Sequence, residues 1–131
     1  MNLPATAHRS PARATRALGQ YGERLAERYL RDRGLTILDR NWRCVRGEID
    51  IVALDEECLV FVEVKTRTTQ AFGAPFEAVT RLKLARLRLL SGLWREAADV
   101  QWRGRPSRID VVSILRPRSG PARIEHLRAV Q

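Results

Sequence analysis

Four charged residues on two neighbouring β-rich segments have the types and the spacing of a cation-binding acidic site. Glu48 and Asp50 alternate along one apolar segment, and Glu63 and Lys65 alternate along the next. Alternate residues of a strand share a face, so each pair projects from one side of its strand. Carboxylates gathered in this way raise one another's pKa unless a cation lies among them. Oxygen ligands without thiolate or imidazole favour Mg²⁺ or Mn²⁺ over zinc.

The segments that carry these residues predict a β-hairpin, because 48–54 and 58–65 are rich in β-branched residues and flank a short polar turn. If Leu54 lies opposite Leu59, Asp50 lies opposite Glu63 at the open end of the hairpin. By the same register Glu48 lies opposite Lys65. One face of the hairpin is then wholly apolar and contains Ile49, Ile51, Ala53, Val60, Val62 and Val64.

The bland alternative is a solvated edge, where acids and lysines alternate in cross-strand ion pairs. Both faces of these strands are apolar near the turn, which favours burial over a free edge. Burying carboxylates without a partner costs several kcal/mol. A divalent cation is therefore expected to neutralise what Lys65 does not.

Hydrophobic spacing predicts the elements around the hairpin. Together they predict an α/β domain with a central mixed sheet flanked by helices, in α-β-β-β-α-β order. The second helix carries two adjoining apolar stripes, one of Leu82, Ala85, Leu89 and Leu93 and one of Leu87, Leu90, Trp94 and Ala97. The expected elements are a helix at 18–33, a strand at 35–41, the hairpin, a helix at 77–98, a strand at 109–115 and a weaker edge strand at 123–130.

A chain of 131 residues is the size of one domain. Residues 1–17 contain arginine and no acid, and we expect a flexible basic arm there, with an organellar transit peptide as the alternative. The folded domain is then 18–131. No apolar run approaches the ~18 residues that cross a bilayer. Cys44 and Cys58 form no metal-binding pattern and predict two free thiols in a reducing compartment, the cytoplasm.

The charge of the chain points to a polyanionic partner. Lysine and arginine number 24 against 15 acids, a net charge of +9. Such a surface attracts nucleic acid, although an arginine-rich genome produces the same composition. Trp42 is expected either to stack on a base or, more simply, to pack in the core. The residues expected to contact phosphates, rather than only to form a solvated surface, are Arg43, Arg46, Arg67, Lys83 and Arg86.

Asp50, followed thirteen positions later by Glu63-Val64-Lys65, resembles the PD-(D/E)XK nuclease motif, with Ile49 where proline often precedes the aspartate. More closely, residues 19–115 resemble the YraN-like family of uncharacterised bacterial proteins. This likeness implies a restriction-endonuclease-like fold, distantly similar to archaeal Holliday-junction resolvases. The features that carry it are Gly22-Glu23, Asn41-Trp42-Arg43, Gly47-Glu48-Ile49-Asp50, Phe61-Val62-Glu63-Val64-Lys65-Thr66-Arg67, Phe72-Gly73, Lys83 and Arg108-Ile109-Asp110-Val111-Val112.

The resemblance implies that Asp50 and Glu63 hold Mg²⁺ or Mn²⁺, with the backbone carbonyl of Val64 as a further ligand. Lys65, beside two carboxylates, is expected to stay protonated and to stabilise the attacking hydroxide or the charge that develops on the phosphate. Glu23 borders the apolar stripe of the first helix and either completes the metal site or is simply solvated. Glu48 is a ligand, an indirect partner of the site or an ion-pair partner of Lys65.

The implied reaction is hydrolysis of phosphodiester bonds in DNA, with a preference for branched or single-stranded structure and a possible homodimer. Two alternatives remain open. One is a non-catalytic nucleic-acid-binding module that keeps the fold for its shape, and the other is a subunit that a partner activates.

Overall fold

Helices and strands follow one another in the order that the sequence predicts. The computed structural model describes residues 11–68 and 79–131. A short 3-10 helix, which the sequence did not indicate, follows the second helix. The elements are α2 (Pro11–Asp32), β1 (Thr36–Cys44), β2 (Gly47–Asp55), β3 (Cys58–Thr68), α3 (Arg81–Ala97), the 3-10 helix η2 (Val100–Trp102), β4 (Ser107–Arg116) and β5 (Arg123–Leu127).

The five strands form one mixed sheet in the order β1-β2-β3-β4-β5. Every neighbouring pair is antiparallel except β3 and β4, which are parallel. Parallel strands need a crossover connection, and α3 lies in the connection between β3 and β4. The α/β class, the mixed sheet and the order of the elements are therefore confirmed.

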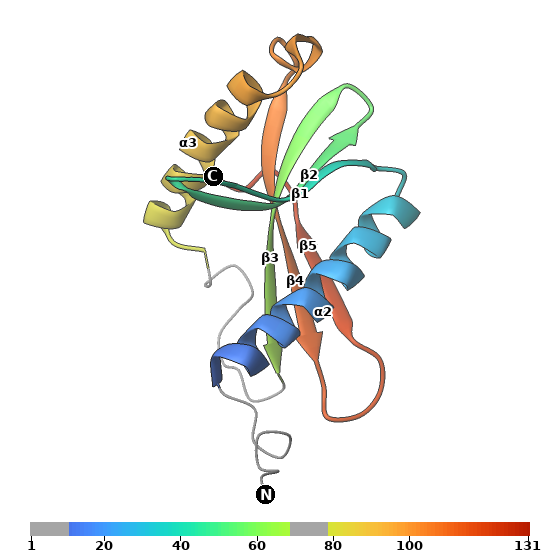
Figure 1. Ribbon diagram of the computed structural model, residues 1–131. Coiled ribbons are helices and arrows are strands. Elements are labelled where there is room, and N and C mark those ends of the chain that lie inside the picture. The colour runs from blue at the N-terminus through green and yellow to red at the C-terminus, as the bar shows by residue number, and fades with distance from the viewer. Residues whose placement is uncertain (1–10, 69–78) are drawn as a thin grey trace, which may run out of the picture.

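The two helices cover opposite faces of the sheet (Figure 1). Ala26 and Leu30 of α2 pack with Val62 of β3 in one core cluster. On the other face Leu87 of α3 packs with Phe61 in a second cluster. Alternate residues of β3 thus pack against different helices, which explains why this strand is apolar on both faces. In the part of the chain that the structure describes, no helix is long and apolar enough to cross a membrane.

The first helix begins earlier than expected. It starts at Pro11, so residues 11–17, expected to belong to a flexible arm, continue the helix. Proline suits the first helical turn, where its missing N–H has no intrahelical partner, and alanine and arginine are good helix formers. Residues 1–10 of that arm lie outside the described residues.

The second helix buries a single apolar stripe. Thr80 caps its N-terminus by accepting a hydrogen bond from the Lys83 N–H at 3.1 Å, and the expected start at residue 77 lies outside the described residues. Leu82 and Leu89 are 75% and 44% exposed, so the stripe to which they were assigned does not face the sheet. A helix that packs on one sheet face needs only one stripe. The buried residues are Leu84, Leu87, Leu90, Ser91 and Trp94.

The outer half of the β1–β2 hairpin bends toward α3. Ile51 packs in the α2-side cluster, but Ile49, two residues earlier, packs in the α3-side cluster. The prediction that both share one apolar face is therefore wrong. Opposite this point in β1, Asn41 has a φ of +48°, a left-handed conformation that asparagine tolerates better than most residues. The bend brings Gly47 against Leu90, and Figure 1 shows the hairpin end reaching α3.

Candidate active site

Strands β2 and β3 part at the candidate acids. Leu54 pairs with Leu59 as predicted, and the pairing continues only as far as Ile51 opposite Val62. The next residues along are Asp50 and Glu63. Beyond the ladder the Val64 N–H donates to Asp50 Oδ2 at 2.8 Å, so the carboxylate replaces the lost backbone acceptor. Asp50 therefore has a structural role, and it also lies next to Glu63 in the predicted acidic site.

Glu63 is buried and is paired chiefly with a lysine from α3. Its Oε2 lies 2.6 Å from Lys83 Nζ and 3.9 Å from Lys65 Nζ, and its side chain is only 8% exposed. Lys83 was expected to contact nucleic acid, and Lys65 was expected to be the cation of the acidic pair. Lys83, in the first turn of α3, therefore reaches Glu63 more closely than Lys65 of the same strand does.

The two lysines affect each other. The pKa of Lys65 is lowered by burial and by the adjacent Lys83, against the opposing charges of Glu63 and Asp50. For Lys83, burial lowers the pKa but the hydrogen bond and charge of Glu63 outweigh it, so the pKa is raised overall. The strand pattern predicts only the two carboxylates beside Lys65, because the second ammonium, that of Lys83, comes from α3.

Asp50 carries the charge that the site compensates least. Burial raises its pKa to about 7, the charge of Glu63 adds to the rise, and the hydrogen bond from Val64 opposes it. The carboxylates of Glu23 and Glu48 raise this pKa further. Among the described residues no ion pair to Asp50 is recorded. A carboxyl in this position favours protonation or a bound cation.

Glu23 approaches the acids because α2 lies very close to β3. A Cβ at Gly22 would overlap the side chain of Thr66, so only glycine permits this approach. The pKa of Glu23 is raised by burial and by nearby carboxylates, while a hydrogen bond from Asn41 lowers it. A fully solvated side chain, the alternative left open above, does not fit this environment. Glu27, one turn later, instead binds Arg40 at the helix surface.

Two hollows meet at Asp50. The first, here called the hairpin hollow, has a volume of about 460 Å³ and lies between the β1–β2 hairpin and α3. The second, the α2 hollow, has a volume of about 210 Å³ and contains Glu23 and Asn41. Asp50 lines both of them. The hairpin hollow is lined by Arg43, Cys44, Gly47, Glu48, Asp50, Glu63, Lys83, Arg86, Leu87 and Leu90.

The donor set fits a hard divalent cation only in part. Among the described residues no three His, Cys, Asp or Glu side chains gather closely enough to hold a metal. Asp50 and Glu63 supply two carboxylates, and Lys83 occupies one oxygen of Glu63. Mg²⁺ usually keeps several waters and takes only one or two protein carboxylates, so this pair is sufficient for that mode of binding.

Comparisons with known proteins identify the family. The family model described as "Uncharacterised protein family UPF0102" matches residues 22–114. A UPF0102 protein of Beutenbergia cavernae is 59% identical over 118 residues, which cover 90% of this chain and 98% of the relative. A UPF0102 protein of Kineococcus radiotolerans is 52% identical over 118 residues, 90% of this chain and 96% of the relative. The chain belongs to the UPF0102 family.

The matched UPF0102 region contains every acid and lysine of the candidate site, from Glu23 to Lys83. The YraN-like resemblance is supported at the level of this family. Of its motifs, Phe72-Gly73 lies outside the described residues. The two cysteines are free and partly buried, as expected. Trp42 packs partly buried in the α3-side cluster, as the simpler alternative proposed.

The basic residues divide between the hairpin hollow and the surface of this UPF0102 chain. Arg43 and Arg86 line the hollow, and Arg46 lies in the exposed turn of the hairpin. Arg67 is half-buried near the end of β3. The expectation that Glu48 lies opposite Lys65 is wrong, because the pairing of β2 with β3 ends at Ile51. Glu48 instead lies opposite Arg43 of β1 and forms a 3.5 Å ion pair with it. The bend at Asp50 carries Glu48 away from β3.

Two contributions were not assigned from the sequence. Asn41 was quoted only as part of a motif, and its signal is a turn-forming residue in the middle of a strand. Lys83 was assigned to the nucleic acid, and no local pattern links it to Glu63, twenty positions earlier. Asp110 forms an ion pair with Arg108, two positions earlier on the same strand, from Arg108 Nε to Asp110 Oδ1 at 3.0 Å. His126 Nε2 also lies 2.7 Å from Asp110 Oδ2.

Proposed function

We propose that this protein is a metal-dependent nuclease of the PD-(D/E)XK class with a restriction-endonuclease-like fold, and that it hydrolyses phosphodiester bonds in DNA. The observation that carries the proposal is the convergence of Asp50 and Glu63 where β2 leaves β3, beside Lys65 and an arginine-lined hollow. An element order of helix, hairpin and crossover helix to a parallel strand supports the assignment of the class.

Asp50 and Glu63, with the Val64 carbonyl, are the residues that would hold Mg²⁺ or Mn²⁺. Such an ion supplies Lewis-acid activation of water and offsets charge on the phosphate. Lys83 neutralises Glu63 and fixes its position. Because Glu63 is already paired, Lys65 is left to stabilise negative charge on the attacking oxygen or on the phosphate. Glu23 faces Asp50 from α2 and adds to the negative potential that attracts the cation.

The substrate follows from charge. A protein with a net charge of +9 attracts a polyanion, and Arg43 and Arg86 flank the acids where phosphates would approach. Contacts of this kind give affinity without reading sequence. Branched or single-stranded DNA is the preferred substrate in this proposal, and two active sites in a homodimer would serve two strands. The free thiols of Cys44 and Cys58 suit the cytoplasm.

The test is cleavage of end-labelled linear duplex, single-stranded and four-way DNA with Mg²⁺, Mn²⁺ or EDTA. We expect cleavage that requires metal and that falls at least about 100-fold in Asp50→Asn and in Glu63→Gln. Glu57→Gln, at the exposed turn between β2 and β3, is the matched control and should cleave as the wild type does. Equal cleavage by the two site variants and the control would exclude these carboxylates from the reaction.

The Glu63–Lys83 ion pair favours a second candidate, a nucleic-acid-binding module without catalysis. This pair neutralises the charge of Glu63 without a metal. The module predicts binding whose affinity falls by about 0.9 log units per log unit of salt for each duplex phosphate contacted. It also predicts that Asp50→Asn binds DNA at least as tightly as the wild type, and that no metal produces cleavage. Titration with Mn²⁺, followed by paramagnetic broadening near Asp50, distinguishes the two candidates.

A further inference from the structure

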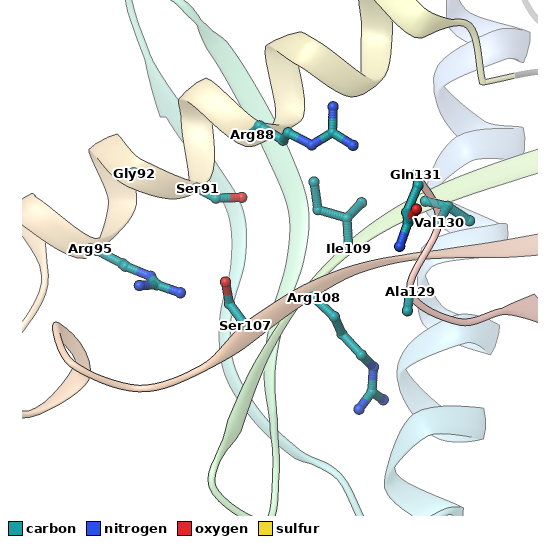
Figure 2. Close-up of a pocket in the computed structure, with 10 residues that line it drawn as sticks. All are labelled: Arg88, Ser91, Gly92, Arg95, Ser107, Arg108, Ile109, Ala129, Val130 and Gln131. Atoms are coloured by element: carbon teal, nitrogen blue, oxygen red, sulfur yellow. The ribbon is translucent and has the colours of Figure 1, made fainter.

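A second hollow with unusual charge lies on the other flank of α3. It has a volume of about 490 Å³ and is enclosed by α3, the start of β4 and the last residues of the chain (Figure 2). Three arginines and two serines contribute to its lining, and no Asp or Glu side chain does. We call it the α3–β4 hollow. Its lining residues are Arg88, Ser91, Gly92, Arg95, Ser107, Arg108, Ile109, Ala129, Val130 and Gln131.

Two of the three arginines are available to a ligand. Arg108 is held by Asp55 and Asp110, each at 3.0 Å, and so contributes little free charge. For Arg88 no ion pair is recorded in the part of the chain that the structure describes. Arg95 makes only a long 3.5 Å contact to the backbone carbonyl of Arg103. Figure 2 shows Arg95 extending from α3 toward the start of β4, whereas Arg88 extends along α3.

The chemistry of the hollow matches a phosphate group. The planar guanidinium fork binds phosphate oxygens at two points, which a lysine cannot do. Gly92 lies between the two arginines along α3, and a Cβ there would meet no other atom, so the helix surface between them is open. The Ser91 hydroxyl is not a ligand, because it donates to the Leu87 carbonyl at 2.7 Å. Arg88 and Arg95 are therefore the contact residues.

We infer that the α3–β4 hollow binds a backbone phosphate of the same nucleic acid whose scissile phosphate enters the hairpin hollow. This inference rests on the proposed function and adds the path that the nucleic-acid strand takes across α3. The hollows lie on opposite flanks of one helix, since Leu87 and Leu90 line the first and Ser91 and Arg95 line the second. A helix with side chains is about 10–12 Å across, so the two phosphates belong to different nucleotides.

Cations line both flanks of α3, and a nucleic-acid strand that crosses the helix would contact both sets. The exposed face between the two flanks contains Leu82 and Leu89. The only acid of α3 is Glu96, near the C-terminal end. A mononucleotide cannot reach both hollows, whereas an oligonucleotide of several residues can. The cations of α3 are Arg81, Lys83, Arg86, Arg88 and Arg95.

The test uses fluorescence anisotropy with labelled oligothymidylates of 2 to 16 nucleotides in EDTA, so that binding is measured without cleavage. The variant is Arg88→Ala with Arg95→Ala. The matched control is Arg118→Ala with Arg123→Ala, which removes the same charge from exposed positions around the β4–β5 connection. We expect at least about a 10-fold loss of affinity for the longer oligonucleotides, no change for dinucleotides, and a log–log salt slope smaller by about 0.7, one single-strand phosphate.

Two outcomes would overturn the inference. One is an equal loss of affinity in the variant and the control, which would indicate net charge alone. The other is an equal effect at all oligonucleotide lengths. If the variant binds as the wild type does but Asp50→Asn abolishes cleavage, the nuclease proposal stands and the α3–β4 hollow is excluded. If the variant loses long-strand affinity but the wild type cleaves no substrate, the hollow is retained and the nuclease proposal fails.

Discussion

Replacing Asp50 with asparagine should stabilise the protein without metal at neutral and alkaline pH. Asparagine has nearly the same shape, and its amide oxygen can still accept the hydrogen bond from the Val64 N–H, 2.8 Å in the wild type. What disappears is a buried negative charge beside Glu63. The substitution therefore separates the structural role of this side chain from its electrostatic cost.

The magnitude follows from the pKa of Asp50. Burial and the charge of Glu63 raise it from 3.8 to about 7. At about 1.4 kcal/mol for each pH unit, this rise corresponds to about 4 kcal/mol. Because the folded-state pKa is above the unfolded value, the folded protein holds an extra proton between about pH 4 and pH 7. The wild type therefore loses stability as the pH rises through that window, and above it the full cost is present.

Thermal and urea unfolding of the wild type and Asp50→Asn at pH 4, 5, 6, 7 and 8 measure this effect. The gain in unfolding free energy should grow from near zero at pH 4 to about 3–4 kcal/mol at pH 8, or roughly 10 °C in Tm for a chain of this size. Glu57→Gln, an exposed charge on the same hairpin, should show no such pH dependence. A gain that is the same at every pH, or a loss at every pH, would refute the reasoning.

Three further predictions concern the cation, the helix contact and the buried network. Mg²⁺ or Mn²⁺ should raise the Tm of the wild type at pH 8 but not that of Asp50→Asn, as measured by differential scanning fluorimetry. Gly22→Ala should lower the unfolding free energy by about 1–3 kcal/mol through overpacking against Thr66, and Thr66→Ala should restore part of it in urea titrations. Burial raises the pKa of Asp110, but hydrogen bonds from His126 and Arg108 outweigh it and the pKa is lowered, so the stability it contributes is present above pH 3.8 and lost on acidification. Asp110→Asn should therefore cost about 3–5 kcal/mol at pH 7 and progressively less as the pH falls below 3.8.

The β2–β3 hairpin was predictable because the sequence pattern that specifies it is local. Alternating apolar residues fix which side chains share a face, and a shift of the pairing by two positions leaves these faces unchanged. The structure, with its turn at Glu56 and Glu57, places Leu54 opposite Leu59. The same locality explains the ion pair between Arg108 and Asp110, two positions apart on one strand. The order of the elements follows from similar short-range patterns.

What the sequence could not give depends on tertiary packing. Ile49 lies on the opposite face from the one predicted because the end of the β1–β2 hairpin packs against α3. This helix begins more than thirty residues later in the chain. Lys83 reaches Glu63 from the first turn of α3, the helix in the connection between β3 and the parallel strand β4. Periodicity contains no information about either approach. The pairing of Lys65 with the acids, which periodicity did indicate, is the weaker of the two contacts, at 3.9 Å.

The parting of β2 from β3 explains the structural role of Asp50. A strand that leaves its neighbour exposes a backbone N–H, and a side-chain acceptor at the first unpaired position satisfies it. An asparagine there would accept the same bond without the electrostatic cost, so the backbone alone does not require a carboxylate. The acid raises the free energy of the folded state at neutral pH, and only a bound cation or a proton removes that penalty. A residue that is structurally replaceable by a less costly one is expected where binding or catalysis needs the charge.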